Sequence, residues 1–183
     1  MQKKIPILGI VASGSNAGKT TLITQLIPEL TARNIRVSVI KHAHHSFDID
    51  HVGKDSYKIR ESGAVQTLIA SGKRWALMTE MPRLPEATNE ANLADLIAQI
   101  NPNYADLILV EGFKHAVIHQ KPLPKIEVYR LDLDLPLLAT TDSSIIAVAS
   151  DATLALNIPT LDLNNIQQIT NFIVQKFMLI NPD

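Results

Sequence analysis

A short polar stretch near the start of the chain, Ser13–Thr21, carries the residue types that could bind phosphate. It follows the apolar run Ile5–Val11 directly and precedes a predicted helix. Small residues let backbone N–H groups turn inward around phosphate oxygens, a lysine reaches the terminal phosphates, and a hydroxyl can bind Mg²⁺. The stretch therefore predicts a phosphate-binding loop, made by Gly14, Ser15, Asn16, Ala17, Gly18, Lys19, Thr20 and Thr21.

The loop departs from the usual pattern at its first glycine position, which is occupied by Ser13, with Gly14 one residue later. The residues that the chemistry needs most, Gly18, Lys19 and Thr20, are all present. The alternative is a Gly/Ser turn that carries a lysine by chance. A strand before the loop and an amphipathic helix after it favour the phosphate loop.

A second candidate group is the carboxylate of Glu111, which follows the apolar residues Leu107–Val110 and precedes Gly112. In open α/β sheets the ligand lies beyond the carboxyl ends of the strands. A carboxylate there can hold Mg²⁺ directly or through water, although aspartate is commoner in that role. We therefore expect Glu111 to face the phosphate loop as a catalytic and metal-binding residue, against the alternative of an ordinary strand end.

The segment Lys41–His51 follows a predicted strand, Val37–Ile40, and is rich in histidine and aspartate. One hypothesis is that Asp48 or Asp50 reaches nucleotide-bound Mg²⁺, because hard cations prefer oxygen ligands. A second is a transition-metal site, and a third is a solvated loop that binds nothing. We favour the first, with Asp48 as catalytic and metal-binding residue and the histidines as catalytic or partner-facing groups. The histidines of this segment are His42, His44, His45 and His51.

Asp151 is a candidate reader of guanine, because it follows the late predicted strand Ile145–Ala149. A carboxylate can accept both the N1–H and the exocyclic amino group of guanine, which adenine does not offer. The asparagine and lysine that usually accompany such an aspartate are replaced by Val148 and Ala149. The alternative is that Asp151 caps a turn toward Leu154.

The pattern along the chain predicts an α/β fold with a mostly parallel sheet flanked by helices, a phosphate-loop NTPase fold with extra hairpin strands. The expected helices are Thr20–Asn34, Ser56–Glu61, Leu93–Ile100 and Asn165–Met178. The expected strands, besides those already named, are Val65–Ala70, Trp75–Met78, Lys125–Arg130 and Ile158–Leu161.

Composition indicates one soluble globular domain over residues 1–183, with 46% hydrophobic and 19% charged residues. The net charge of -1 gives no reason to expect nucleic acid or a membrane as partner. The chain has no cysteine, which excludes disulfides and thiolate metal sites. We expect a cytoplasmic location.

Several blocks of the chain together resemble the family of molybdopterin-guanine dinucleotide biosynthesis adapter proteins. The resemblance implies a homodimer that binds GTP and Mg²⁺, hydrolyses GTP weakly, and assists the guanylyltransferase that attaches GMP to molybdopterin. It also implies that Thr20 and Glu111, together with Asp48 or Asp50, form the metal environment. The blocks are Gly14–Thr21, Lys41–His45, Gly53–Tyr57, Arg74–Glu80 and Leu109–Lys114.

The alternative function is an ATP-dependent kinase or ligase for a small molecule, like the dethiobiotin-forming members of the same phosphate-loop class. No arginine finger or water-orienting glutamine is evident beside Glu111 and Gly112 in the sequence, which favours slow turnover.

Overall fold

The computed structural model describes residues 4–43, 47–86 and 91–178. Contacts divide the chain into two compact units rather than spreading evenly over one. The first unit comprises residues 1–42 and 93–183, and the second comprises residues 43–92. The single domain expected from the sequence thus contains two units, of which the first carries the phosphate loop.

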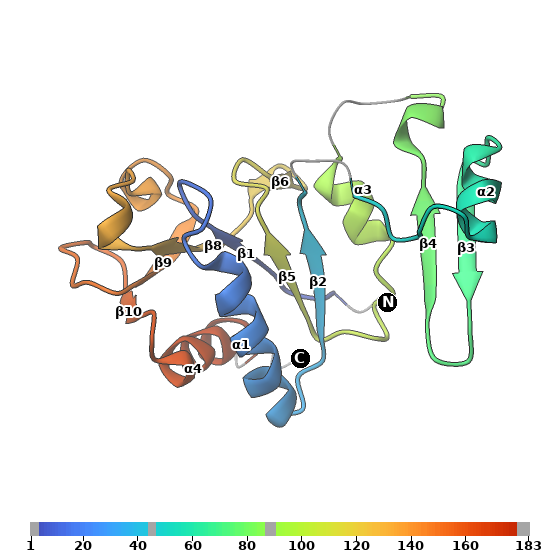
Figure 1. The fold of residues 1–183 in the computed structure, drawn as a ribbon. Helices are drawn as coiled ribbons and strands as arrows, with labels where there is room; N and C mark the ends of the chain where they lie inside the picture. Colours follow the sequence, from blue (N-terminus) through green and yellow to red (C-terminus); the bar gives the residue numbers. More distant parts are fainter. Residues whose placement is uncertain (1–3, 44–46, 87–90, 179–183) are drawn as a thin grey trace. The chain divides into compact units, whose positions relative to one another are not determined.

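A six-stranded sheet forms the centre of the first unit, with the order β10-β9-β8-β1-β5-β2 and every neighbouring pair parallel. The parallel α/β sheet predicted from the sequence is confirmed. β5 lies between β1 and β2, although it follows them late in the chain (Figure 1). The strands are β1 (Ile7–Val11), β2 (Val37–Lys41), β5 (Leu107–Glu111), β8 (Lys125–Tyr129), β9 (Ile145–Ser150) and β10 (Thr160–Asp162).

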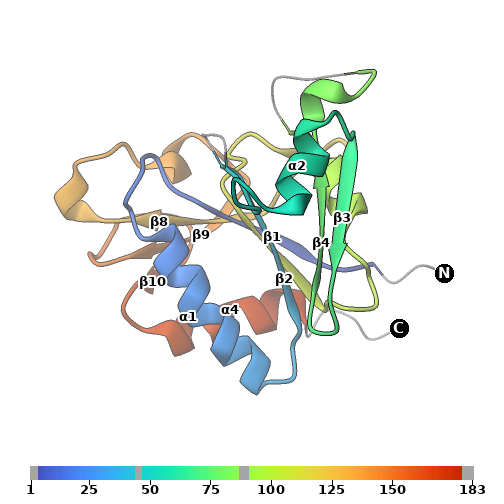
Figure 2. The same ribbon diagram turned by 45° about the vertical axis from the view of Figure 1, so that its right-hand side comes forward.

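Helices cover both faces of this sheet. α1 (Lys19–Ala32) and α4 (Ile166–Phe177) lie together on one face (Figure 2), where residues such as Leu26 and Ile173 are fully buried in the larger core cluster. α3 (Leu93–Ala98) packs in the smaller cluster, with Ile108 and Val110 of β5. β5 is buried along its whole length, as expected for a strand covered on both faces.

α1 ends near the position that the sequence indicated. Asn34, the predicted stop, has a φ of 61°, the left-handed conformation that commonly terminates a helix. Pro28 lies inside the helix. In the described part of the chain, no helix combines the length and the apolar character needed to cross a membrane.

The second unit consists of α2 (Asp55–Glu61), β3 (Gln66–Ala70), β4 (Trp75–Thr79) and a 3₁₀ turn, η1 (Met81–Arg83). β3 and β4 pair antiparallel, which confirms the predicted hairpin. Arg60 of α2 is the charged centre of this unit, since its guanidinium lies 3.0 Å from Asp48, 3.2 Å from Asp50 and 5.0 Å from the ring centre of Tyr57. Its side chain is only 12% exposed.

The segments after β5 and β8 hold elements that the sequence did not predict. A small hairpin pairs β6 (Val117–Ile118) with β7 (Lys121–Pro122) through His119 and Gln120, both at positive φ. Two residues in this conformation are typical of the tight turn in a two-residue hairpin. Two 3₁₀ turns, η2 (Leu131–Leu133) and η3 (Leu138–Thr140), follow β8.

A buried lysine ties the loops after β5 and β8 to the sheet. Lys125, the first residue of β8, is 2% exposed, and its ammonium donates to the carbonyl of Lys114 at 2.5 Å and to Asp142 at 2.6 Å. Burial by itself would raise the pKa of Asp142, but the hydrogen bonds from Lys125 and Ser144 together with the charge of Lys125 outweigh it, and the pKa is lowered. The side-chain stem of Lys125 runs past Gly9 of β1, where an added Cβ would lie 2.7 Å from the Lys125 Cγ.

We expect Lys125→Met to lower the free energy of unfolding by about 2 kcal/mol at pH 7, less than for a fully buried pair because Asp142 is partly exposed. The lowered pKa of Asp142 means that its stabilising effect is present above the usual aspartate range and is lost as pH falls through the folded pKa. The cost of the substitution should therefore shrink in acid. Urea denaturation at pH 7 and at low pH measures the free energy of unfolding of the parent and of Lys125→Met. Lys121→Met on exposed β7 is the control. An equal cost at both pH values would contradict it.

Candidate functional site

The predicted phosphate loop joins β1 to the first turn of α1. Asn16 and Gly18 take positive φ values of 62° and 99°, which turn the backbone inward. Gly18 is the N-cap of α1 and offers no side chain, so the first N–H groups of the helix are not capped by that residue. This arrangement places the first backbone N–H groups of α1 and the positive end of the helix dipole at the loop, which suits an anion.

Two lysines hold carbonyl oxygens of this loop. The Lys19 ammonium donates to the Gly14 oxygen at 3.0 Å, and the Lys114 ammonium donates to the Ser13 oxygen at 2.6 Å. Burial lowers the pKa of Lys19, Glu111 acts against this, and repulsion from Lys114 and Lys41 adds to it. The ammonium groups of Lys114, bonded to Ser13, and of Lys41, bonded to Thr20, thus both lie near Lys19.

The structure brings Thr20 and Glu111 into direct contact. The Thr20 hydroxyl donates to Glu111 Oε1 at 2.7 Å, and the Lys41 ammonium lies 3.2 Å from each of these oxygens. Glu111 is 8% exposed and stands beside Ile10 of β1 on one side and Lys41 of β2 on the other. Two hard oxygen donors at the start of a phosphate-binding helix fit Mg²⁺, so Thr20 and Glu111 are the residues that could hold it.

Asp48, the third predicted metal residue, belongs to the second unit and forms an ion pair with Arg60, as does Asp50. Its role at the metal stays a prediction. Of the histidines, His42 stacks on Phe113 with ring centres 4.6 Å apart. His44 and His45 lie outside the described residues, and within the described residues no group of three or more His, Cys, Asp or Glu side chains could hold a metal ion.

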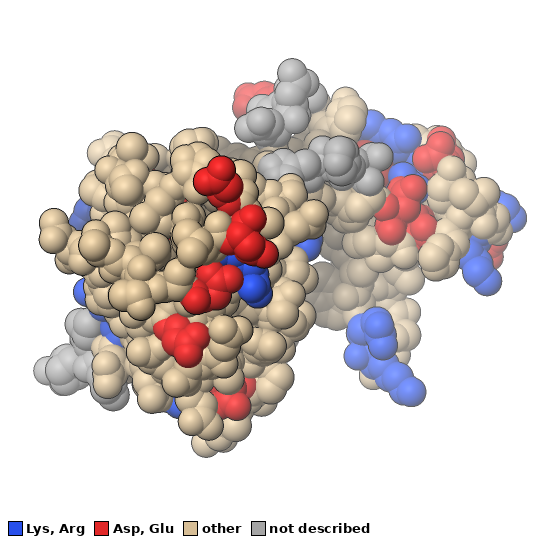
Figure 3. Space-filling model, turned by 60° about the vertical axis from the view of Figure 1, so that its left-hand side comes forward, with Lys and Arg blue, Asp and Glu red and all other residues tan. Residues whose placement is uncertain are grey.

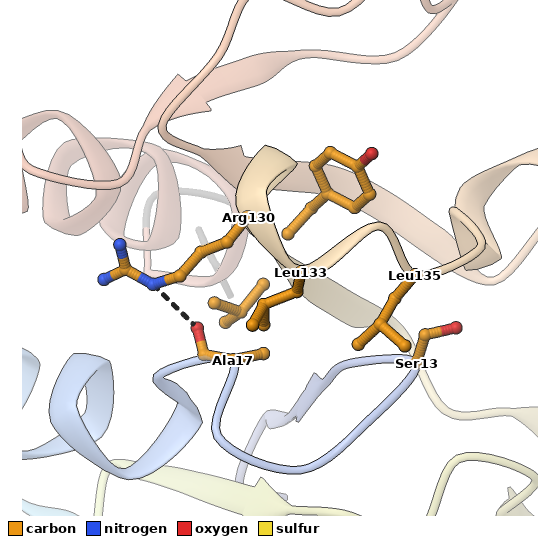
Figure 4. A pocket seen from close by; sticks show the side chains of 7 residues that line it. Ser13, Ala17, Arg130, Leu133 and Leu135 are labelled. Carbon is orange, nitrogen blue, oxygen red and sulfur yellow. Dashed lines mark hydrogen bonds between the residues drawn. The ribbon is translucent and has the colours of Figure 1, made fainter.

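The segment after β8 lies over the phosphate loop, as Figure 4 shows. Arg130 donates from Nε to the Ala17 oxygen at 3.3 Å, while Leu133 and Leu135 line the same small pocket as Ser13. An added Cβ on the Gly14 residue would lie 2.7 Å from Leu135. A side chain at position 14 would meet Leu135, so the glycine permits this close approach.

Asp151, the predicted guanine reader, lies at the carboxyl end of β9 next to this segment. Its carboxylate accepts from the backbone N–H of Leu131 at 3.1 Å and lies 3.4 Å from the Arg130 guanidinium. The turn that follows is capped by Ser150, whose hydroxyl oxygen accepts from the Ala152 N–H at 3.0 Å. Arg130 therefore links Asp151 to the phosphate loop.

Reasoning from the sequence missed Arg130 and Lys114 as neighbours of the loop. Both come just after the carboxyl end of a strand that pairs with β1, Arg130 after β8 and Lys114 after β5. That position was a usable signal, because the carboxyl ends of parallel strands gather around the ligand.

The chain is similar to known proteins over most of its length. Residues 7–151 match the family model described as molybdopterin guanine dinucleotide synthesis protein B. The chain belongs to this family. The match begins at β1 and ends at Asp151, so it includes every residue of the site described above.

Individual relatives support the assignment over nearly the whole chain. The chain is 44% identical over 173 residues to the molybdopterin-guanine dinucleotide biosynthesis adapter protein of Haemophilus influenzae, covering 94% of this chain and 90% of that protein. It is 44% identical over 172 residues to the adapter protein of Escherichia coli, covering 93% of each.

Solved structures show the same fold. A crystal structure of molybdopterin-guanine biosynthesis protein B has a TM-score of 0.67 at 28% identity and covers 93% of this chain and 99% of its own. The Bacillus subtilis protein B structure has a TM-score of 0.68 at 21% identity, with coverage of 94% and 98%, and supports the fold alone.

Proposed function

We propose that the protein is a GTP-binding adapter with weak GTPase activity that assists molybdopterin-guanine dinucleotide biosynthesis. The observation that carries the nucleotide part is the 2.7 Å contact between Thr20 of the phosphate loop and Glu111 at the end of β5. It joins the loop hydroxyl to a carboxylate, the pair that Mg²⁺ needs beside a nucleotide. The role in this pathway is supported by membership of the family and by relatives that are named adapter proteins.

Each residue of the site has a distinct task in this proposal. The N–H groups from Gly14 to Thr21 surround the phosphate oxygens, and Lys19 exchanges the Gly14 carbonyl for the terminal phosphates. Thr20 and Glu111 hold Mg²⁺, which when bound neutralises phosphate charge. Asp48 is proposed to join them as a catalytic and metal-binding residue.

The proposed partner is the guanylyltransferase that joins GMP to molybdopterin, and the proposed location is the cytoplasm. Nucleic acid and membranes are not proposed as partners. On the face drawn in Figure 3, a row of Asp and Glu lies beside the basic side chain near the centre of the view, which makes that area unfavourable for phosphate backbones. Turnover of several nucleotides per second with a small acceptor would contradict the adapter function and favour a kinase or ligase.

Lys19→Ala should weaken GTP binding at least about tenfold, because one charge-assisted contact to phosphate is lost. The fold should persist, since Lys19 lies at the loop rather than in the core clusters. Calorimetric titration with GTP, GDP and ATP in the presence of Mg²⁺ measures the nucleotide affinities. Lys58→Ala on α2, which also removes one positive charge, is the control. A folded Lys19→Ala protein that binds GTP as tightly as the parent would refute the phosphate-loop assignment.

We further propose that Asp151 selects guanine. Its position at the carboxyl end of β9, linked through Arg130 to the Ala17 carbonyl, places a carboxylate next to the phosphate loop. Guanine presents two adjacent donors to such a carboxylate. A carboxylate has about four lone-pair sites, so it can accept both donors in addition to the Leu131 N–H.

Asp151→Ala should weaken GTP binding about tenfold to a hundredfold and leave weak ATP binding nearly unchanged, as expected for a bidentate charge-assisted contact. Competition between the two nucleotides on the parent and the variant gives both values. Asp162→Ala, at the end of neighbouring β10, is the control. Equal losses for GTP and ATP would show that Asp151 supports only the segment after β8.

The homodimer is proposed from the resemblance, and the hairpin β3–β4 supports it. Leu68 and Trp75 of this hairpin are each 61% exposed. A two-stranded sheet is marginally stable alone, and its free edges can pair with another chain. A second copy of the chain would cover these apolar side chains.

Sedimentation at micromolar concentration should therefore give twice the chain mass of 20.1 kDa. Leu68→Asp should shift the protein toward monomer, because a charge would be buried at the contact. Tyr104→Asp changes a side chain that is equally exposed but lies outside the hairpin, and it should leave the mass unchanged. A parent protein that sediments only as a monomer would rule out the dimer.

A further inference from the structure

One ammonium group bridges the two oxygens that hold Mg²⁺ in the proposed function. Lys41 Nζ donates to Thr20 Oγ1 and to Glu111 Oε1, in both cases at 3.2 Å. These two oxygens are themselves 2.7 Å apart. The lysine therefore contacts the same pair of donors that a divalent cation would use.

The backbone of Lys41 is fixed while its side chain is free to swing. Lys41 ends β2 directly beside Glu111, and the next N–H, that of His42, donates to the Glu111 carbonyl at 3.0 Å. His42 then stacks on Phe113. The Lys41 side chain is nevertheless 54% exposed, so its ammonium can leave the two oxygens without any change in the sheet.

The negative charge of Glu111 needs a neighbouring positive charge, because the Glu111 side chain is only 10% exposed. A largely buried carboxylate is costly without a cation beside it. Mg²⁺ binds oxygen at about 2.1 Å and would compete with the ammonium for the same lone pairs while repelling its charge. The other two loop lysines, Lys19 and Lys114, instead hold the carbonyls of Gly14 and Ser13.

We propose that Lys41 is an internal substitute for the metal ion: its ammonium neutralises Glu111 when Mg²⁺ is absent and is displaced when Mg²⁺ binds. The inference rests on the proposed function, which supplies the metal. The displaced ammonium stays tethered to β2, within reach of the nucleotide phosphates. Lys41 thus sets how strongly nucleotide binding depends on Mg²⁺.

The test compares GTP dissociation constants in EDTA and in millimolar Mg²⁺ for the parent and Lys41→Met, which keeps the apolar stem. In EDTA the variant leaves Glu111 without the ammonium that is bonded to its carboxylate, so GTP should bind more weakly. In Mg²⁺ the metal supplies the charge. We expect the GTP dissociation constant in EDTA divided by that in Mg²⁺ to be about tenfold larger for Lys41→Met than for the parent, which is the effect of one charge-assisted contact.

Two controls make the result specific. Lys114→Met removes a neighbouring ammonium that bonds the Ser13 carbonyl, and it should change both constants by the same factor. In a Glu111→Gln background, Lys41→Met should no longer raise the ratio, because the carboxylate is gone. An unchanged ratio for Lys41→Met in the otherwise native protein would overturn the inference.

A measurement with metal alone separates this inference from the proposed function. Electron paramagnetic resonance titration with Mn²⁺, without nucleotide, should show about tenfold tighter binding to Lys41→Met than to the parent. Equal Mn²⁺ affinity would overturn the role of Lys41. If Lys41→Met bound Mn²⁺ more tightly than the parent but neither protein bound GTP, the proposed function would fail and the role of Lys41 would stand.

Discussion

The site depends on the register of three parallel strands. β1, β5 and β2 align so that Ile10, Glu111 and Lys41 are lateral neighbours at the carboxyl edge. Strands in a sheet are about 4.8 Å apart, so a lysine and a glutamate in this register reach each other and the first turn of α1. A shift by one residue would turn Glu111 to the other face and separate it from Thr20.

Each cationic side chain of the site bonds a different acceptor of the protein. Lys19 and Lys114 bond loop carbonyls, Lys41 bonds the side-chain oxygens of Thr20 and Glu111, and Arg130 bonds the carbonyl of Ala17. Each of these four side chains therefore has a hydrogen-bond acceptor within the protein when no nucleotide is bound. In the proposed function, a bound nucleotide would exchange these contacts for phosphate oxygens instead of bringing unpaired charges together.

Local features of the fold were predictable, and contacts between distant strands were not. The phosphate loop and the helix after it follow from residues that are adjacent in sequence, and the apolar run before Glu111 identified a buried strand. That Lys41 stands beside Glu111 depends on β5 entering between β1 and β2, which no local pattern encodes. The ion pair of Asp48 with Arg60 was hidden for the same reason, since it joins a loop to a helix.

The late entry of β5 also has a consequence for synthesis on the ribosome. β1 pairs on one side with β5 and on the other with β8. The strand pairs of Ile10 with Glu111 and with Ile126 can therefore form only after those later residues have left the ribosome. Closing such long loops is slow and leaves apolar strand edges exposed meanwhile. The second unit, residues 43–92, is made entirely within this interval. Its antiparallel hairpin pairs neighbours in sequence, so it can form while the parallel sheet is still incomplete.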